Sequence, residues 1–273
     1  MNTANYSLFY DDQCPFCIWY SSKFVNSGIL RAENRKPFEK IQEAKYDRIN
    51  RELAKNQIAL YNEDNQTVQY GADSMITLLA IKVSWINIFL SNPVLHFIAQ
   101  QVYLFISYNR KVFAPTLSCA SNGCQPDFHL GYRISLILMT ALFTGLILNS
   151  YTASIYQELY GRSMPALWEW LVCLGQLFFQ GAMVLMINPR KTWDYLGQMS
   201  LVSFLGGVAL LPMLAIKAIL DLNVYLTIGY FGIIVGLMLL LHAKRVSIIA
   251  APKILSATWV IYRILVLLIM SQL

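Results

Sequence analysis

Cys14 and Cys17 are the residues of this chain whose type and spacing point most directly to chemistry. They stand where an apolar, strand-like run ends in a polar turn and a helical pattern begins. A cysteine at a helix N-terminus faces unpaired amide groups and the positive end of the helix dipole, which favour thiolate over thiol. Cys17 would lie one turn later, within reach of the first sulfur. The spacing therefore predicts a dithiol redox centre, with Cys14 as the attacking thiol and Cys17 as the resolving thiol.

Asp11 comes just before the turn that leads to these cysteines. A buried carboxylate beneath Cys17 is a base that can take and return the proton of the resolving thiol. The same carboxylate can instead accept backbone amide hydrogens and so cap the turn or the helix. We therefore name Asp11 as a catalytic candidate, with capping as its alternative role.

Cys119 and Cys124 form a second pair, in a polar segment that precedes the long apolar blocks. The Asn122-Gly123 step between them favours a chain reversal that brings two sulfurs to bonding distance. This pair is a candidate second redox pair, which would exchange electrons with the first pair through a mixed disulfide. The alternative is that both are incidental loop cysteines.

The four thiols also fit zinc, because two closely spaced cysteine pairs can form a tetrahedral site. Zinc sites are compact, whereas these pairs are separated by a whole domain, so dithiol chemistry is the favoured interpretation. Thiol–disulfide exchange needs no cofactor, and we predict neither a cofactor nor a metal. Two other residues are assigned structural roles: His129 as an interfacial side chain and Cys173 as a small packing residue.

The surrounding pattern predicts the elements that position the first pair. A buried strand over residues 6–11 leads into a helix over 14–27, which Gly28 ends. Further along, the sequence predicts a charged helix over 39–55, a hairpin of strands over 57–61 and 67–70, and helices over 72–84 and 94–108. With a short strand near Leu30, this order is typical of a small thioredoxin-like α/β unit.

Three stretches carry a resemblance to a known family. YDDQCPFC at residues 10–17, YGADS at 70–74 and YNRKVF at 108–113 resemble the signature stretches of the DCC family of thiol-disulfide oxidoreductases. The resemblance covers residues 6–115 and implies a thioredoxin-like fold with thiol–disulfide exchange at the two cysteines.

Two positions depart from that resemblance. Asp12 stands where the family usually has glycine, which predicts a turn of different shape. No proline precedes the strand at residue 57, where thioredoxins carry the cis-proline that faces the disulfide. We therefore do not expect a substrate to dock as it does on thioredoxin.

The composition indicates a membrane protein. Hydrophobic residues make up 56% of the 273 residues and charged residues only 13%, which is too apolar for an ordinary soluble protein. We expect a thioredoxin-like domain over residues 1–115, a cysteine-containing linker over 116–132 and an all-α membrane domain over 133–273. Five apolar stretches of about 20 residues predict its transmembrane helices, at residues 134–155, 165–187, 196–216, 224–242 and 254–271.

The net charge of +6 is assigned to the membrane flanks rather than to a nucleic-acid partner, because lysines and arginines alternate with glutamates in residues 31–55. The loops after the second and fourth predicted spans are positive, and such loops face the cytoplasm. Their charges come from Arg190, Lys191, Lys244, Arg245 and Lys253. No signal-sequence pattern opens the chain. We therefore expect an integral protein of the bacterial inner membrane, with the lipid bilayer as a partner and the N-terminal domain in the cytoplasm.

The predicted topology depends on whether residues 75–107 cross the membrane. The stretch is apolar, but Lys82 and the Asn92-Pro93 step interrupt it. We expect a buried or membrane-facing helix of the soluble domain. The alternative, an additional span, would place residues 1–70 on the opposite side of the membrane from residues 109–132.

Glu169, His242 and Arg263 fall within the predicted spans, where ionisable side chains are costly and often functional. Glu169 lies between two tryptophans and is predicted to be an interfacial anchor, and His242 to stand at a span end. Arg263 is the membrane-domain candidate nearest mid-span, as a partner for Glu169, a lipid headgroup or a quinone-like substrate.

Together these patterns predict a membrane-anchored thiol-disulfide oxidoreductase that acts on an unknown protein or small-molecule thiol or disulfide. The alternative is a non-catalytic regulatory or assembly module, fused to a transporter-like or lipid-handling membrane domain. Loss of function on substitution of Cys14 or Cys17 would favour the first, and a larger effect at Arg263 would favour the second.

Overall fold

The computed structural model describes residues 5–115, 126–161, 165 and 167–270. The chain divides into two units, Met1–Tyr132 and Arg133–Leu273, which we call the N-terminal and C-terminal units. Cys119 and Cys124 lie outside the described residues.

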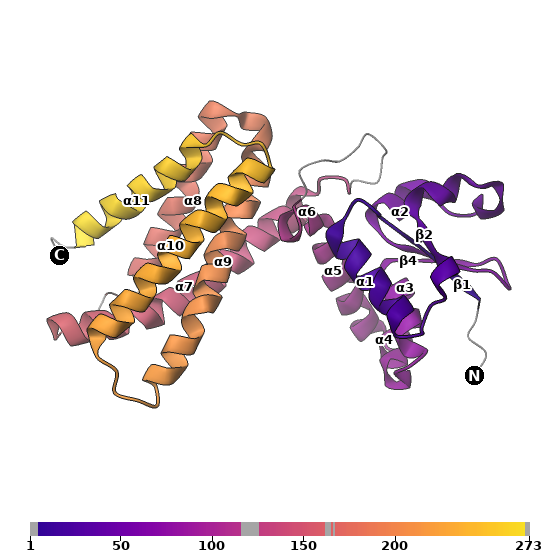
Figure 1. Cartoon of the computed structure of the whole chain (residues 1–273), viewed down its shortest axis with the longest axis horizontal. Helices are drawn as coiled ribbons and strands as arrows, with labels where there is room; N and C mark the ends of the chain where they lie inside the picture. The colour runs from indigo at the N-terminus through magenta and orange to yellow at the C-terminus, as the bar shows by residue number, and fades with distance from the viewer. Residues whose placement is uncertain (1–4, 116–125, 162–164, 166, 271–273) are drawn as a thin grey trace. The chain divides into compact units, whose positions relative to one another are not determined.

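A four-stranded mixed sheet organises the N-terminal unit (Figure 1). Its strands are β1 (Tyr6–Tyr10), β2 (Arg35–Pro37), β3 (Ala59–Asn62) and β4 (Val68–Tyr70), in the order β2-β1-β3-β4. β1 pairs in parallel with β2 and antiparallel with β3, and β3 and β4 form the predicted hairpin. The thioredoxin-like fold class expected from the sequence is confirmed.

The helices of this unit follow the strands closely. They are α1 (Pro15–Asn26), α2 (Arg51–Asn56), α3 (Gly71–Ala80), α4 (Ile88–Ser91), α5 (Pro93–Tyr108) and α6 (Arg110–Phe113). Four 3-10 turns accompany them, η1 (Ala32–Asn34), η2 (Phe38–Gln42), η3 (Ala44–Tyr46) and η4 (Ser84–Asn87).

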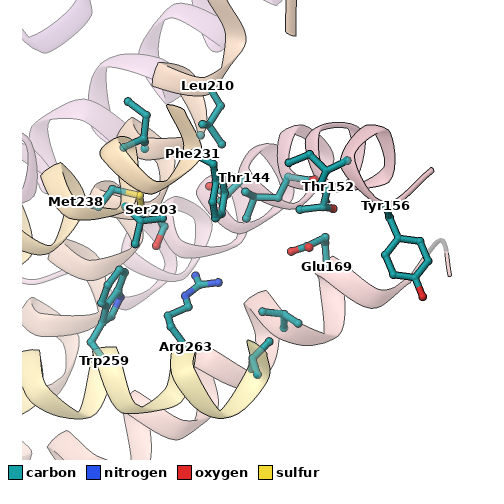
Figure 2. A pocket seen from close by; sticks show the side chains of 18 of the residues that line it. Thr144, Thr152, Tyr156, Glu169, Ser203, Leu210, Phe231, Met238, Trp259 and Arg263 are labelled. Carbon is teal, nitrogen blue, oxygen red and sulfur yellow. Dashed lines mark hydrogen bonds between the residues drawn. The ribbon is translucent and has the colours of Figure 1, made fainter. Parts of the chain in front are cut away.

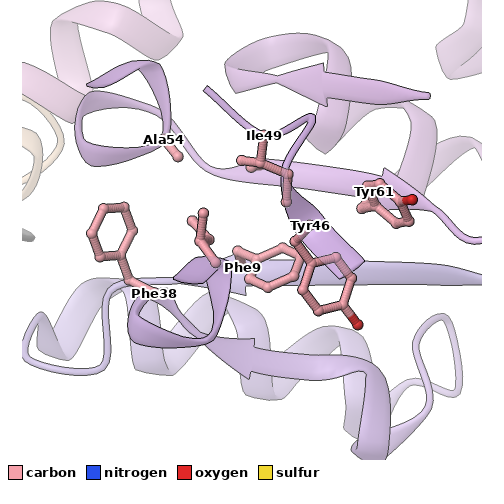
Figure 3. Close-up of a cluster of buried hydrophobic side chains, with 8 residues drawn as sticks. Phe9, Phe38, Tyr46, Ile49, Ala54 and Tyr61 are labelled. Carbon is pink, nitrogen blue, oxygen red and sulfur yellow. The ribbon is translucent and has the colours of Figure 1, made fainter. Parts of the chain in front are cut away.

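Alternation along the central strand β1 builds a separate core on each face of the sheet. Phe9 points to one face, where it packs in a cluster with Phe38, Tyr46 and Tyr61 (Figure 3). Leu8 points to the other face and packs with side chains of α1 and α3, such as Phe24 and Leu78. Side chains therefore pack against both faces of β1, the strand that leads into the turn before Cys14.

Two glycines are required by the backbone. Gly28 follows α1 with φ +70°, and the amide of Ile29 returns to the carbonyl of Phe24 at 3.0 Å, so the helix ends where the sequence predicts. Gly71 has φ +60°, and a Cβ atom there would clash with Oε1 of Gln57 and lie 3.2 Å from the Tyr103 ring. At this position only glycine allows β4 to turn directly into α3.

The predicted helix over residues 39–55 is wrong. The segment instead forms η2 and η3, and its one helix, α2, begins only after Asn50, whose side chain caps it by accepting the amide of Leu53 at 3.1 Å. Tyr46, 1% exposed, has to reach the sheet core, and a continuous helix would not place it there. The short strand expected near Leu30 lies at residues 35–37 instead.

The segment from η4 through α5 presents an apolar outer surface. No Asp, Glu, Lys or Arg occurs between Ser84 and Tyr108, and Trp85, Val94 and Phe97 are at least 60% exposed. Neither the η4–α4 segment nor α5 is long and apolar enough by itself to cross a membrane. The two together are, but they meet at an angle of 98°.

The C-terminal unit is a set of long apolar helices (Figure 1). They are α7 (Leu130–Tyr160), α8 (Trp168–Ile187), α9 (Thr192–Lys217), α10 (Val224–Ile248) and α11 (Ile254–Met270), with the 3-10 turn η5 (Pro189–Lys191) before α9. In the described parts of the chain four helices, α7 to α10, are long and apolar enough to cross a membrane, and α11 is shorter. These long apolar helices are compatible with the predicted membrane bundle, but the fifth predicted span, residues 254–271, corresponds to α11, which is shorter than the other four.

Candidate functional site

Cys14 and Cys17 lie where β1 gives way to α1. Cys14 is the N-cap residue, in an extended conformation. Pro15 occupies the first turn of the helix, where the amide hydrogen that proline lacks would have had no helical partner. Cys14 is 7% exposed and Cys17 is 3% exposed. The thiol that was expected to attack is thus at the helix end, and the thiol that was expected to resolve is one turn inside.

The two thiols are near each other but not bonded. Their sulfurs and a carboxylate oxygen of Asp11 all lie within 4.8 Å of one another. The Cys17 thiol donates a hydrogen bond to the Cys14 sulfur, and this bond is the main reason that the pKa of Cys14 is lowered from 9.0 to about 7. Burial opposes that shift, while the Cys17 amide and the charge of Arg110 add to it.

The same hydrogen bond, together with burial, raises the pKa of Cys17 far above its ordinary value. At neutral pH Cys14 is therefore partly thiolate while Cys17 keeps its proton. This difference in protonation is what an attacking and a resolving thiol require.

Asp11 is part of a buried ion pair. Its Oδ2 accepts a hydrogen bond from Nη2 of Arg110 at 3.1 Å, and both side chains are less than 10% exposed. Its Oδ1 accepts the amide of Gln13 at 3.0 Å, which is the capping role. Burial raises the pKa of Asp11, and the Arg110 charge opposes that rise. Asp11 thus caps the turn and also stands beside the thiols.

The turn forms without a glycine at Asp12. Gln66 and Ala250 are the described non-glycine residues with positive φ, so Asp12 does not adopt a left-handed conformation. Asp12 is exposed, and the turn is closed by the amide of Cys14, 3.4 Å from the carbonyl of Asp11. An aspartate fits here because the backbone conformation is an ordinary one.

Arg110 is the site residue that sequence reasoning missed. It lies 99 residues from Asp11 along the chain and also donates to the carbonyl of Lys55 at 3.2 Å. Asn109 beside it is fully buried and donates to the carbonyls of Phe105 and Tyr132, at 3.0 and 2.9 Å. The available signal was the Asn-Arg pair of the third signature stretch, which carried no role from its spacing alone.

Two tyrosines complete the walls of the site. The hydroxyl of Tyr20 is buried and its ring packs beside Cys17, so it can donate to that sulfur. The hydroxyl of Tyr103, on α5, accepts the amide of Ile58 at 2.9 Å, and burial raises the pKa of Tyr103 to about 12. Ile58 immediately precedes β3, where thioredoxins carry a proline. This chain has an amide hydrogen at that position instead, and the hydrogen is bonded to the Tyr103 hydroxyl.

Asp11, Cys14 and Cys17 offer three metal-ligand atoms in one place. The carboxylate is already neutralised by Arg110, and a divalent cation there would sit close to a guanidinium group. This charge arrangement fits a dithiol better than a metal centre. The zinc alternative also needs Cys119 and Cys124, which lie outside the described residues.

Two of the candidates in the C-terminal unit lie together. Glu169 is 5% exposed and, with Arg263, lines one cavity (Figure 2), while its role as an interfacial anchor stays a prediction. The Glu169 carboxylate and the Arg263 guanidinium are not paired within 4.0 Å. The sequence could not show this burial, because it depends on helices that are distant in the chain.

His242 is buried within α10, toward the C-terminal end of the helix. It is 1% exposed, with Nε2 3.2 Å from the Tyr195 hydroxyl and Nδ1 3.1 Å from Oγ of Ser256. Cys173 is buried in an apolar cluster, as a packing residue would be. The His129 ring contacts the Tyr132 ring in a tilted arrangement, with 4.7 Å between the ring centroids.

Comparison with known proteins gave one match. Residues 8–114 match the family model described as DCC1-like thiol-disulfide oxidoreductase. This part of the chain runs from within β1 to the end of α6 and includes every residue of the thiol site described above. No curated protein and no solved structure gave a significant match.

Proposed function

We propose that the N-terminal unit catalyses thiol–disulfide exchange, with Cys14 as nucleophile and Cys17 as resolving thiol. The observation that carries this proposal is the opposite shift of the two thiol pKa values at one helix N-terminus. The family match over residues 8–114 supports the same chemistry.

In the reducing direction the Cys14 thiolate attacks one sulfur of a substrate disulfide. A Cys14–substrate disulfide forms, the substrate S–S bond breaks, and the second substrate sulfur leaves as a thiolate. Cys17 then loses its proton and attacks the Cys14 sulfur, which releases the first substrate sulfur. The substrate gains two electrons and ends as two thiols, while Cys14 and Cys17 end as a disulfide.

Asp11 is the group we assign to the proton of Cys17. Its carboxylate lies within 4.8 Å of the sulfur, and burial raises its pKa toward a range in which it can hold a proton. Arg110 holds this carboxylate in place and adds positive charge near the Cys14 thiolate. We treat Arg110 as a positioning residue because it acts through these groups.

The C-terminal helices would anchor this domain to a bilayer. The positive loops support a cytoplasmic placement of the N-terminal unit in a bacterial inner membrane. In that compartment the resting form is the dithiol, which favours reduction of a substrate or redox sensing over disulfide formation. The partner is a protein or small molecule that carries a thiol or disulfide.

A relay through Cys119 and Cys124 would extend this exchange. Their segment follows α6, which carries Arg110 of the thiol site. In such a relay the Cys14–Cys17 disulfide passes to the second pair through a mixed disulfide. Differential alkylation with acid quenching checks the relay: Cys119→Ser should leave Cys14 and Cys17 trapped as a disulfide after one turnover.

The proposed exchange is tested with the purified full-length chain in lipid nanodiscs and a small protein disulfide as substrate. Cys17→Ala should accumulate a mixed disulfide at Cys14, and Cys14→Ala should form none. Cys173→Ala, which changes a buried thiol outside the site, is the matched control and should react as the unchanged protein does. If Cys14→Ala still reduces the substrate, the exchange proposal fails, and the non-catalytic module becomes the better account.

A further inference from the structure

The C-terminal unit contains a partly open cavity of about 380 Å³, to which all five helices contribute side chains. Small-molecule sites in proteins are typically about 300–1,000 Å³, and an apolar cavity of about 150 Å³ already holds benzene. The cavity is therefore large enough for a ring with part of a hydrocarbon chain.

Most of its wall is apolar. Aliphatic side chains come from α7, α9 and α10, and aromatic rings from α10 and α11. Representative members are Leu148, Leu210, Ile234, Met238, Phe231 and Trp259. Such a lining takes up an apolar molecule and leaves orientation to a few polar groups.

Two opposite charges face this apolar space. Figure 2 shows the carboxylate of Glu169 on one side and the guanidinium of Arg263 on the other, both directed into the cavity. No ion pair within 4.0 Å joins them, and among the described residues Arg263 has no hydrogen-bond partner. Its guanidinium lies 5.7 Å from the centre of the Trp259 ring.

A small polar chamber of about 20 Å³ adjoins the cavity at Arg263, and Thr144, Gln176 and Ser200 help to line it. These three side chains are 2%, 2% and 4% exposed. Within the described chain, Oγ1 of Thr144, both amide atoms of Gln176 and Oγ of Ser200 have no hydrogen-bond partner. Buried polar groups are normally satisfied, so this cluster indicates that a polar ligand group or water belongs beside Arg263.

The charges narrow the class of ligand. A fatty-acid carboxylate suits Arg263 but is repelled by Glu169, and an alkylamine has the reverse difficulty. A phospholipid headgroup belongs at the membrane interface, whereas Arg263 lies near the middle of α11. A neutral ring with two oxygen atoms carries no charge for either group to repel. One oxygen accepts a hydrogen bond from Arg263, and the other, as a hydroxyl of the reduced ring, donates a hydrogen bond to the Glu169 carboxylate.

We propose that this cavity binds a lipid-soluble quinone. One ring carbonyl accepts hydrogen bonds from Arg263 and the Thr144 hydroxyl, the other faces Glu169, and the hydrocarbon tail follows the apolar wall. Phe231 and Trp259 contact the ring. This binding does not depend on the exchange reaction of the N-terminal unit, and either can fail without the other.

The test is photolabelling of the full-length chain in nanodiscs with a decyl-azidoquinone, followed by peptide mass spectrometry. Labels should fall on the cavity-lining parts of α7, α8 and α11. An excess of decyl-benzoquinone should remove them, and equal concentrations of decanoate or decylamine should not.

Arg263→Met should lower labelling about tenfold, because a hydrogen bond to a charged group is lost. Arg190→Met makes the same chemical change at an exposed residue of η5 and should leave labelling unchanged. Thr144→Val removes a hydroxyl that no described residue uses, so it should reduce labelling with little effect on folding. The Thr144→Val variant therefore still tests the proposal if Arg263→Met does not fold.

Competition by decanoate but not by the quinone would overturn the proposal in favour of an anionic lipid. Labels spread over lipid-facing residues, or unaffected by both Arg263→Met and Thr144→Val, would also overturn it. Neither result bears on the thiol chemistry, which is read with a separate substrate.

Discussion

Replacing Cys17 by alanine should change the pH profile of Cys14 in a way that follows directly from the site. The hydrogen bond from the Cys17 thiol is the largest cause of the lowered Cys14 pKa. Without it, burial becomes the largest remaining cause and raises the pKa, while the Cys17 amide and the Arg110 charge still lower it. We expect the Cys14 pKa to return from about 7 toward the ordinary value of 9.0.

The expected rates can be worked out from this shift. At pH 7 a thiol with a pKa of 7 is half ionised and one with a pKa of 9 about 1% ionised, a factor of about 50. A thiolate of lower pKa is intrinsically less nucleophilic, by about six- to tenfold over two units. The unchanged protein should therefore react only about five- to eightfold faster at pH 7. The two profiles cross near pH 8, and above that pH the Cys17→Ala variant reacts faster.

The assay is stopped-flow exchange with a small aromatic disulfide between pH 5 and 10, on chains that also carry Cys119→Ser and Cys124→Ser. The unchanged Cys14–Cys17 pair should level off above pH 8, and the Cys17→Ala variant should keep rising to about pH 10. Arg110→Gln should shift the midpoint in the same direction but less, because its charge is a smaller cause. A midpoint near 7 in Cys17→Ala would refute the assigned hydrogen bond.

Other predictions concern stability of the full chain, measured by thermal unfolding in detergent. Arg110→Met leaves the Asp11 carboxylate buried without its ion-pair partner and should cost about 3–5 kcal/mol, whereas the double variant with Asp11→Asn should recover part of that loss. Equal losses in the single and double variants would contradict the pairing. Gly71→Ala should cost more than Gly28→Ala, since both have positive φ but only at Gly71 would the new Cβ meet another atom, Oε1 of Gln57; Gly28→Ala should cost about 1–2 kcal/mol.

The parts of the fold that depend on neighbouring residues were predictable. The strand–turn–helix at Cys14, the end of α1 at Gly28 and the β3–β4 hairpin all follow from local pattern and turn chemistry. The segment over residues 39–55 was not predictable in the same way. Its charges suggest a helix, but Tyr46 and Ile49 are fixed by the far face of the sheet, so tertiary packing overrides the local preference.

The site residues fall into the same two groups, those that are close in sequence and those that are brought together only by the fold. Cys14, Cys17 and Asp11 are close in sequence and were found from spacing. Arg110 was not, because its contact with Asp11 spans 99 residues and leaves no periodic signal. The burial of Glu169 likewise comes from α7, α10 and α11, whose side chains share its cavity.

The distance in sequence between Asp11 and Arg110 also determines when each of these residues becomes available during synthesis of the chain. The cysteines are made well before the guanidinium that neutralises Asp11, which arrives only with α6. At about 5–20 residues per second, this leaves several seconds in which the nascent thiols lack their final electrostatic surroundings. A chain interrupted before residue 110 therefore carries both cysteines without the guanidinium of the finished site.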